Sequence, residues 1–532
     1  TKVQTKVGSK WVRWWIIPQD WLEGFFIFWG KSKDKLRPMG YSVSKNKLGK
    51  WCLNEWSERK GEFKEKFGKE NPVAPIKVIT ESTLPEYKVK NVEGLREWQV
   101  PSVSRLCASI QVHGAAIDGS DTGTGKTYAA VAVARELGMK IAVVCPKAVI
   151  YAWKKVIEKH FKMDYEFIIN YESLKTGKFK DIGTWKPVSK ISTKEYFQWS
   201  VAKNTLIIFD ESHRLKGWST QNAEMAMEAK RQKYKILCCS ATNAINPIEL
   251  KTTGFILNLY KKNFTQFLRD HNCEKGRFGW EFGGDKKILQ KLHGELFLER
   301  GIRLRKESIV GFPDCEIIAE AYNIDESSEK ELKEVYKDMN KELTLLNIKM
   351  KGTKEYQINA MTIQLRARQK AELLKVPLIV EMIEDSMEDG MSVAVFVNFS
   401  ETIRALMKRL HTTCVVWGEN KGTEREDNIE AFQRDEQRVI LVNVKAGGAG
   451  LSLHDLNGKY PRIALISPTP SAVDLRQALG RIHRDGAKSK ALQKIIFVAN
   501  TEEEDTCERV KLKLENLDTI NDGDVVIGNY FD

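Results

Sequence analysis

The sequence lacks the features that mark several common protein classes. Its 532 residues contain no stretch of about 18 uncharged apolar residues that could cross a membrane, and the first residues form no apolar signal core. The nine cysteines include no Cys-x-x-Cys pair, and none of the eight histidines has metal-ligand spacing. We therefore expect an intracellular, soluble protein of the nucleus, nucleoid or cytoplasm, with reduced thiols, no zinc site and no membrane partner.

Low-complexity tracts and fixed-period repeats are also missing. The apolar content of 42% is ordinary for a globular protein. At roughly 150 residues per domain, the length predicts about three to four domains with separate cores.

Positive charge, in contrast, is abundant and concentrated at the N-terminal end. The net charge is +14, and residues 1–70 hold 16 Lys and Arg against 8 Asp and Glu. Seven of the 14 tryptophans lie within the first 56 residues, among short apolar runs that predict a small β-rich module with one helix over 55–68. Some of these tryptophans are expected in the module's core. Because rings stack on bases and cations hold phosphates, the basic face is expected to bind nucleic acid.

The most informative stretch is GSDTGTGKT at 119–127, which follows the apolar residues 115–118 and precedes a helix-forming run. This order predicts a strand, a phosphate-binding loop and a helix, because backbone N–H groups at a helix N-terminus favour a polyphosphate. The sequence departs from the strict Walker pattern only in having Ser120 where that pattern has glycine. The residues expected to bind ATP here are Gly123, Thr124, Gly125, Lys126 on the β- and γ-phosphates, and Thr127 on Mg²⁺.

An amide side chain lies upstream of this loop. Gln99 stands 27 residues before Lys126, and an amide can bond both the donor and the acceptor edge of adenine. We therefore expect Gln99 to bind the base of ATP.

A second strong signal is NTLIIFDESH at 204–213, in which an apolar strand ends in two carboxylates. Asp210 is expected to hold Mg²⁺, and Glu211 to orient and deprotonate the attacking water. An ordinary strand-end turn is the alternative for this pair alone. Ser240 and Thr242, after another apolar strand, are expected to bond Asp210 or His213 and so to sense the γ-phosphate, although an ST-turn also explains them.

These motifs resemble, in order, those of superfamily-two helicases and translocases. Within that superfamily, the resemblance is to the SWI/SNF-type ATPases, and it is carried by residues 301–313 and by four motifs nearer the C-terminus. The segment 271–296 is similar to the annealing-helicase, HARP-type branch of that family. The resemblance spans about residues 91–515. The C-terminal runs that carry it are 393–406, 419–433, 439–457 and 476–490.

The resemblance implies two RecA-like α/β lobes, each a parallel sheet with helices on both faces, with ATP between them and nucleic acid across both. Gln477 is then a nucleotide contact, and Arg481 and Arg484 are arginine fingers that stabilise the transition state. The implied coupling residues are His213, Ser240, Thr242, Gly448 and Asp455. The implied nucleic-acid contacts are Lys147, Asn398 and Lys445.

The resulting domain plan has four parts. They are an accessory module and linker (1–90), an ATP-binding first lobe (91–310), connecting or brace helices (311–380, with a charged helix over 325–351), and a second lobe with an acidic tail (381–532). We expect residues 516–532 to be a loose tail or a short strand.

The predicted function is an ATP- and Mg²⁺-dependent DNA translocase, acting as a monomer, that remodels or anneals branched or double-stranded DNA in replication, repair or recombination. One alternative is a strand-separating DNA or RNA helicase, for which the sequence shows no wedge. The other is a motor-like scaffold without turnover, although every motif keeps its catalytic residue type.

Overall fold

The computed structural model describes residues 2–7, 10–16, 43–45, 51–54, 81–188, 195–217, 220–261, 263–276, 279–350, 354–447, 451–498 and 502–522. The chain divides into two compact units, 1–77 and 78–532. The described strands of the first unit form an antiparallel sheet in the order β1 (Lys2–Val7), β2 (Lys10–Ile16), β4 (Trp51–Asn54), β3 (Val43–Lys45). This agrees with a β-rich module, whereas the helix predicted over 55–68 lies outside the described residues.

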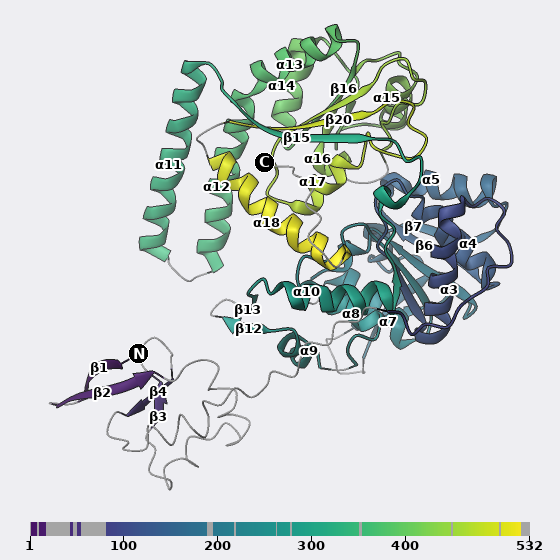
Figure 1. Ribbon diagram of the computed structural model, residues 1–532, viewed down its shortest axis with the longest axis horizontal. Helices are drawn as coiled ribbons and strands as arrows, with labels where there is room; N and C mark the ends of the chain where they lie inside the picture. Colours follow the sequence, from purple (N-terminus) through teal and green to yellow (C-terminus); the bar gives the residue numbers. More distant parts are fainter. Residues whose placement is uncertain are drawn as a thin grey trace. The chain divides into compact units, whose positions relative to one another are not determined.

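The second unit contains two six-stranded parallel sheets, one in each lobe (Figure 1). The strands of the first lobe, in spatial order, are β14 (Gly301–Ile302), β5 (Ala115–Asp118), β11 (Lys235–Cys239), β10 (Thr205–Asp210), β6 (Lys140–Cys145) and β7 (Tyr165–Asn170). They are nearly continuous apolar runs because both faces of the sheet are covered. In β10, Leu206 and Ile208 face one core, while Ile207 and Phe209 face the other.

Helices cover the two faces of this first sheet. One core includes α3 (Val100–His113), α4 (Lys126–Glu136) and α5 (Ile150–Lys154). The other core includes α6 (Tyr171–Leu174), α7 (Gln221–Arg231), α8 (Lys251–Ile256), α9 (Phe264–Asp270) and α10 (Lys286–His293). Two hairpins extend the lobe, β8 (Gly183–Pro187) with β9 (Glu195–Trp199) and β12 (Cys273–Gly276) with β13 (Gly279–Phe282).

The second lobe repeats this architecture. Its strands, in spatial order, are β15 (Cys315–Tyr322), β20 (Ala491–Val498), β19 (Arg462–Ile466), β16 (Ser392–Val397), β18 (Val439–Asn443) and β17 (Val415–Val416). Its helices are α13 (Val376–Glu388), α14 (Ser400–Leu410), α15 (Glu424–Gln433), α16 (Val444–Gly447) and α17 (Ala472–Leu479). The expected fold of two RecA-like lobes is confirmed.

The segment between the lobes differs from the expectation of helices throughout 311–380. Its first element, β15, is an edge strand of the second sheet and pairs with β20. The helices follow as α11 (Glu326–Met350) and α12 (Lys354–Leu374), which run side by side (Figure 1). The sequence CEIIAEAY alternates polar and apolar residues only partly, so its pattern does not distinguish a strand from an irregular connecting segment.

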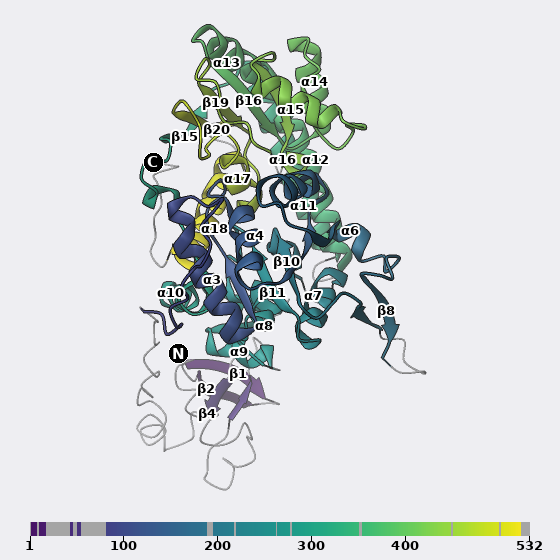
Figure 2. The same cartoon turned by 90° about the vertical axis from the view of Figure 1, so that its right-hand side faces the viewer.

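The C-terminal prediction was also wrong for residues 516–522, which form the end of a helix and no loose tail or strand. Helix α18 spans Glu502–Asp522 and packs its last turns against α10 of the first lobe, where Ile520 is buried in the first lobe's core. Figure 2 shows α17 and α18 between the two sheets. Among the described helices, none is both long and apolar enough to cross a membrane.

Candidate active site between the two lobes

The candidate residues of the first lobe follow the carboxyl ends of adjacent parallel strands. Strand β5 leads into the 119–125 loop, β10 ends at Asp210, and β11 leads to Ser240. In open α/β sheets, ligands bind at this edge. The topology therefore gathers three sequence motifs that are far apart in the chain.

Two glycines give the loop its shape. Gly123 and Gly125 have φ of 88° and 87°, in the left-handed region that favours glycine. A Cβ on Gly125 would lie 2.1 Å from Gln99 Nε2, so a side chain there would displace Gln99. Lys126 Nζ donates to the carbonyls of Ser120 and Asp121 at 2.7 and 2.9 Å. The ammonium thus lies over the loop, where phosphate oxygens can replace these carbonyl partners.

The structure places Gln99 against the loop itself. Its Nε2 donates to the carbonyls of Thr124 and Gly125, both at 3.2 Å, and its Oε1 accepts from the Arg96 backbone N–H at 2.9 Å. The residue is only 4% exposed. The Nε2 end of the amide therefore supports the loop and the Oε1 end is bonded to the backbone of Arg96, so hydrogen bonds to adenine would have to replace these contacts.

Asp210 is held by two donors at the end of β10. Trp153 Nε1 donates to Oδ2 at 2.8 Å, and the Glu211 backbone N–H donates to Oδ1 at 2.9 Å. Burial, and next the charge of Glu211, raise the pKa of Asp210 to about 6. Sequence reasoning missed the part played by Trp153, because the 57 residues that separate it from Asp210 leave no local signal.

Glu211 adopts a left-handed backbone conformation with φ of 51°, which is costly for a residue with a Cβ. Its Oε2 lies 3.2 Å from His213 Nδ1 and accepts from Gln477 Nε2 of the second lobe at 3.3 Å. Burial opposes ionisation, but His213, Lys126 and Arg481 together lower the pKa of Glu211 below its ordinary value. The pKa of Asp210 is thus raised and that of the adjacent Glu211 is lowered.

His213 links Glu211 to the end of β11. Its Nδ1 lies 3.1 Å from Ser240 Oγ and 3.3 Å from Thr242 Oγ1. The three residues and Glu211 form one hydrogen-bonded group inside the first lobe. A movement of the Glu211 side chain can therefore alter the hydrogen bonds of His213 with Ser240 and Thr242 at the end of β11.

The second lobe brings its arginines to the same place. Arg484 packs on the loop, where a Cβ on Gly123 would lie 3.3 Å from Arg484 Cα, and a Cβ on Gly480 would lie 2.0 Å from Thr122 Oγ1. Burial lowers the pKa of Arg481 to about 10 and that of Arg484 to about 9, the latter also through repulsion by Arg481. Both remain cationic at neutral pH. A pair of cations from one lobe thus faces the loop and Glu211 of the other.

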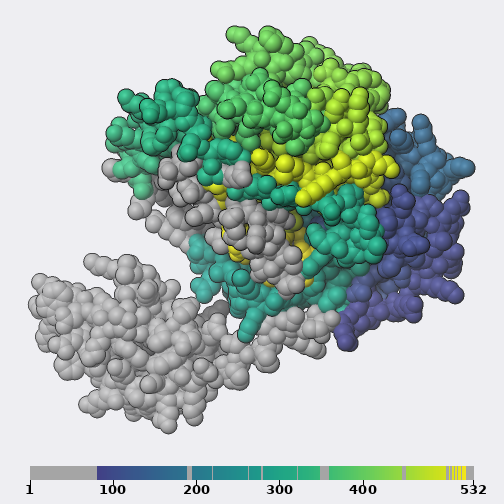
Figure 3. Space-filling model, turned by 45° about the horizontal axis from the view of Figure 1, so that its top comes forward, coloured from purple at the N-terminus to yellow at the C-terminus, as the bar shows by residue number. Residues whose placement is uncertain are grey.

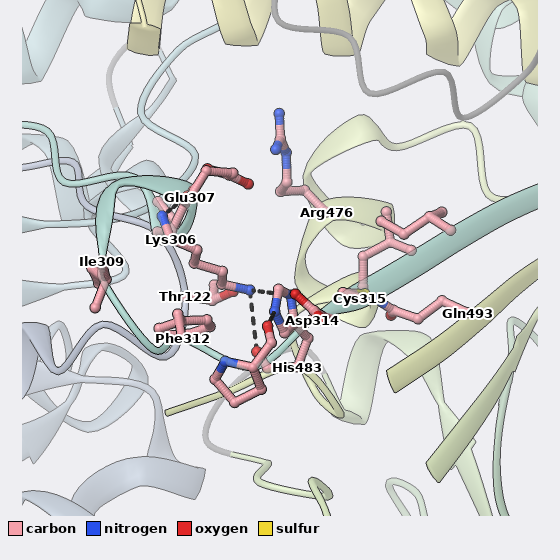
Figure 4. Close-up of a pocket in the computed structure, with 16 residues that line it drawn as sticks. Thr122, Lys306, Glu307, Ile309, Phe312, Asp314, Cys315, Arg476, His483 and Gln493 are labelled. Carbon is pink, nitrogen blue, oxygen red and sulfur yellow. Dashed lines mark hydrogen bonds between the residues drawn. The ribbon is translucent and has the colours of Figure 1, made fainter. Parts of the chain in front are cut away.

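A cavity of about 490 Å³ lies beside this contact, and Figure 4 shows Lys306 reaching across it to His483. Lys306 Nζ donates to the His483 carbonyl at 3.1 Å, and His483 Nε2 donates to the Pro313 carbonyl at 2.7 Å. His483 of the second lobe therefore contacts Lys306 of the first lobe. Burial lowers the pKa of Lys306 to about 8.

The nucleic-acid candidates line two further cavities that share Lys445. Lys147 and Lys445, from different lobes, line one of about 260 Å³ together with Arg214. Asn398 and Lys445 line a second of about 670 Å³ beside α11 and α12. The Asn398 Nδ2 donates to Glu372 and to the Pro468 carbonyl, at 2.7 and 2.9 Å. The side-chain N–H groups of Asn398 are therefore bonded within the second lobe, and its side-chain Oδ1 is the atom that can accept a hydrogen bond from another partner.

Three other predicted residues are less informative. Asp455 is 1% exposed, and its Oδ1 accepts from the backbone N–H groups of Asn457 and Gly458, so these contacts hold a turn within the second lobe. Thr127 is the second residue of α4 and is half-buried. Gly448 lies outside the described residues.

Two family models and several known proteins match this chain. Residues 93–244 match the family described as type III restriction enzyme, res subunit, and residues 374–486 match the helicase conserved C-terminal domain. The chain is 33% identical over 86% of its length to a protein of Acanthamoeba polyphaga mimivirus named "Putative ATP-dependent RNA helicase L364", 88% of which is covered.

Two animal proteins and one solved structure are also similar. SWI/SNF-related matrix-associated actin-dependent regulator of chromatin subfamily A-like protein 1 of Drosophila melanogaster is 24% identical over 84% of this chain, and that of Bos taurus is 23% identical over 78%. The alignments cover 58% and 44% of those proteins, so this chain spans about half of their length. The S. cerevisiae Dbp5 structure bound to RNA and ADP BeF3 aligns with a TM-score of 0.44 and 11% identity, covering 78% of this chain and 87% of that one.

Proposed function

This chain belongs to the superfamily-two helicases and translocases, as a nucleic-acid-dependent ATPase of the SWI/SNF type nearest to the annealing-helicase branch, and from that premise we propose that it is an ATP-driven translocase on duplex, forked or branched DNA. One observation carries the proposal. The phosphate loop and Glu211 of the first lobe meet Gln477, Arg481 and Arg484 of the second. Hydrolysis at this junction depends on how the lobes are placed, which is what a translocase requires.

In the proposed reaction, the loop and Lys126 bind the phosphates of ATP. Glu211 is ionised at neutral pH, because its neighbours lower its pKa, and it accepts a proton from the attacking water. Arg481 and Arg484 approach the γ-phosphate from the second lobe and stabilise the charge that spreads over its oxygens in the transition state. Closing and reopening the lobes then couples turnover to movement along the nucleic acid.

The residues present also suit Mg²⁺, which prefers oxygen ligands. Asp210 offers a carboxylate, each oxygen of which accepts one hydrogen bond and keeps a further lone pair, and Thr127 offers a hydroxyl. When bound, the ion supplies charge neutralisation of the phosphates. Trp153 and the Glu211 backbone N–H orient the Asp210 carboxylate for that role.

The choice of DNA rests on the SWI/SNF-related relatives and on the basic N-terminal segment. The mimivirus relative, whose name is that of an RNA helicase, favours a second candidate, an RNA-directed helicase. The two proposals differ in the nucleic acid that accelerates hydrolysis.

We expect ATP turnover to be stimulated most strongly by forked or duplex DNA. The measurement is the ATPase rate with no nucleic acid, single-stranded DNA, duplex DNA, forked DNA and RNA, at one fixed salt concentration because affinity falls steeply with salt. Stimulation by RNA or unstructured single strands alone would favour the helicase. A fork-unwinding and annealing assay on the same substrates separates strand separation from remodelling.

Lys147→Ala and Lys445→Ala are expected to weaken duplex binding without changing the ATPase rate measured with no nucleic acid. If each lysine neutralises one phosphate, the slope of log K against log salt concentration becomes shallower by about 0.9 for each substitution. Lys408→Ala, at an exposed lysine of α14, is the matched control. An unchanged slope in both cavity variants would remove these residues from the nucleic-acid path.

A further inference from the structure

A segment of the first lobe runs alongside the phosphate loop like an additional strand. The backbone N–H of Gly119 donates to the Ile302 carbonyl at 2.9 Å, and that of Asp121 donates to the Leu304 carbonyl at 3.0 Å. The Lys306 backbone N–H in turn donates to Asp121 Oδ2 at 3.1 Å. The loop's first half therefore takes its shape from residues 302–306.

Arg303 is the side chain that joins this segment to the loop most closely. Its Nη1 donates to the Gly119 carbonyl at 2.7 Å and lies 2.8 Å from Asp121 Oδ1. The side chain is only 5% exposed. Burial opposes ionisation of Asp121, but the charges of Arg303 and Lys306 hold its pKa well below the ordinary range. The loop is thus fixed by a buried pair of charges.

The second partner of Arg303 comes from the other end of the chain. Asp522, in the last turn of α18, places Oδ1 2.8 Å from Arg303 Nε and 3.0 Å from Arg305 Nε, and its side chain is 6% exposed. Arg305 Nη2 also donates to the Asp522 carbonyl at 2.9 Å. A buried guanidinium thus lies between a carboxylate of the loop and a carboxylate of α18.

The end of α18 is anchored to the first lobe by further contacts. Asn521 Nδ2 donates to the Ala241 carbonyl at 3.1 Å, and His293 Nδ1 donates to the Asn521 carbonyl at 2.8 Å. Ile520 is fully buried beside them. Because α18 follows β20 of the second sheet, a movement of the second lobe can move α18 and so change its contacts beside the phosphate loop. In Figure 3 the yellow C-terminal part of the chain borders both the green second lobe and the teal part of the first.

We propose that Arg303 is a positioning residue for the phosphate loop and that Asp522 of α18 holds Arg303 in place, so that the loop has its nucleotide-binding shape while α18 is docked on the first lobe. This inference rests on the proposed binding of ATP to the 119–127 loop. It adds a second path between the lobes, distinct from the arginines that face Glu211.

The physical reason is the cost of a half-compensated buried charge. With Asp522 in place, Arg303 has a carboxylate on either side, and it is hydrogen bonded to both Asp121 and Asp522. When α18 leaves, Arg303 keeps the Asp121 carboxylate and the Gly119 carbonyl but loses its second carboxylate, and its Nε loses its acceptor. A buried ion that loses a partner turns toward water or toward its remaining partner, and either movement disturbs the loop that Arg303 holds.

Asp522→Asn tests the inference in the full chain, through steady-state ATPase kinetics with saturating nucleic acid. We expect the KM for ATP to rise about tenfold, the scale of one buried charge-assisted hydrogen bond, with kcat changed less than about threefold. Asp522→Glu, which keeps the charge, is expected to restore most of the affinity. Glu515→Gln, on the same helix, is the matched control for a lost carboxylate.

A KM for ATP in Asp522→Asn that equals that of Glu515→Gln would overturn the inference. So would an equal loss in the asparagine and glutamate variants, since that result would indicate a packing defect. Binding of a fluorescent ATP analogue, measured without hydrolysis, gives the same comparison independently of the chemical step.

Lys126→Ala distinguishes this inference from the proposed function. If that variant turns over ATP normally, the assignment of the loop to ATP fails. If Lys126→Ala is inactive while Asp522→Asn keeps its KM, the ATP site stands and only the role of α18 is wrong.

Discussion

Glu211→Gln is expected to lower kcat for ATP hydrolysis by about 1,000-fold, within the range that removal of a general base produces. Glutamine has nearly the same shape, so the left-handed backbone and the contacts with His213 and Gln477 can persist. It has no basic carboxylate to receive the proton of the attacking water. The KM for ATP and the affinity for DNA are therefore expected to change little.

The measurement is a comparison of kcat and KM with and without saturating nucleic acid. Glu224→Gln, at an ion pair on α7, is the matched control because it removes a carboxylate whose partner is Arg231 of the same helix. A kcat within about tenfold of the unaltered protein would remove Glu211 from the chemistry. It would then leave the strained backbone at this position without a catalytic explanation.

The parts of the site that could be predicted from the sequence are those encoded in short runs. About ten residues are enough to predict an apolar strand that ends in Asp210 and Glu211, and the same holds for a glycine-rich loop before a helix. Parallel topology then places these strand ends at one edge of the sheet. The hydrogen bond between Gln477 and Glu211, in contrast, was not predicted: the family resemblance implies a nucleotide contact for Gln477, and no local pattern connects residues 266 positions apart.

The parts that could not be predicted depend on contacts between distant segments. Trp153 gives no sign that it orients Asp210, since a buried tryptophan after a strand usually packs in a core. Gln99 was expected at the base of ATP, yet its amide is bonded to the loop, because burial requires both of its ends to find partners. Asp522 lies in a stretch whose acidity suggested a tail, and its partners, Arg303 and Arg305, are more than 200 residues earlier.

Asp455 shows a different reason for divergence. The family resemblance places a coupling residue there, and the structure shows its carboxylate bonded to its own turn in the second lobe. The structure has one arrangement of the two lobes and therefore shows one set of partners for each residue. A residue that changes partners when the lobes move is not identified by these contacts, whereas Arg481 and Arg484 already face the other lobe.

Arg481→Ala is expected to lower kcat by about 1,000-fold or more, the effect of an arginine finger in phosphoryl transfer. Arg481 is 2% exposed, and its charge interacts with Glu211 across the lobes. ATP is held chiefly by the first lobe, so the KM for ATP is expected to change less than kcat. Arg434→Ala, at an exposed arginine of the second lobe, is the control, and thermal unfolding checks that the altered protein keeps its fold.

Two further variants show whether Arg481 acts on the transition state. Arg481→Lys keeps the charge but loses the planar fork, so its kcat should fall between those of Arg481→Ala and the unaltered protein. The double variant Glu211→Gln, Arg481→Ala should be only slightly slower than either single variant, because groups that act in one step are not additive. If the two losses multiplied instead, each residue would contribute independently, and the second lobe would not complete the site that Glu211 serves.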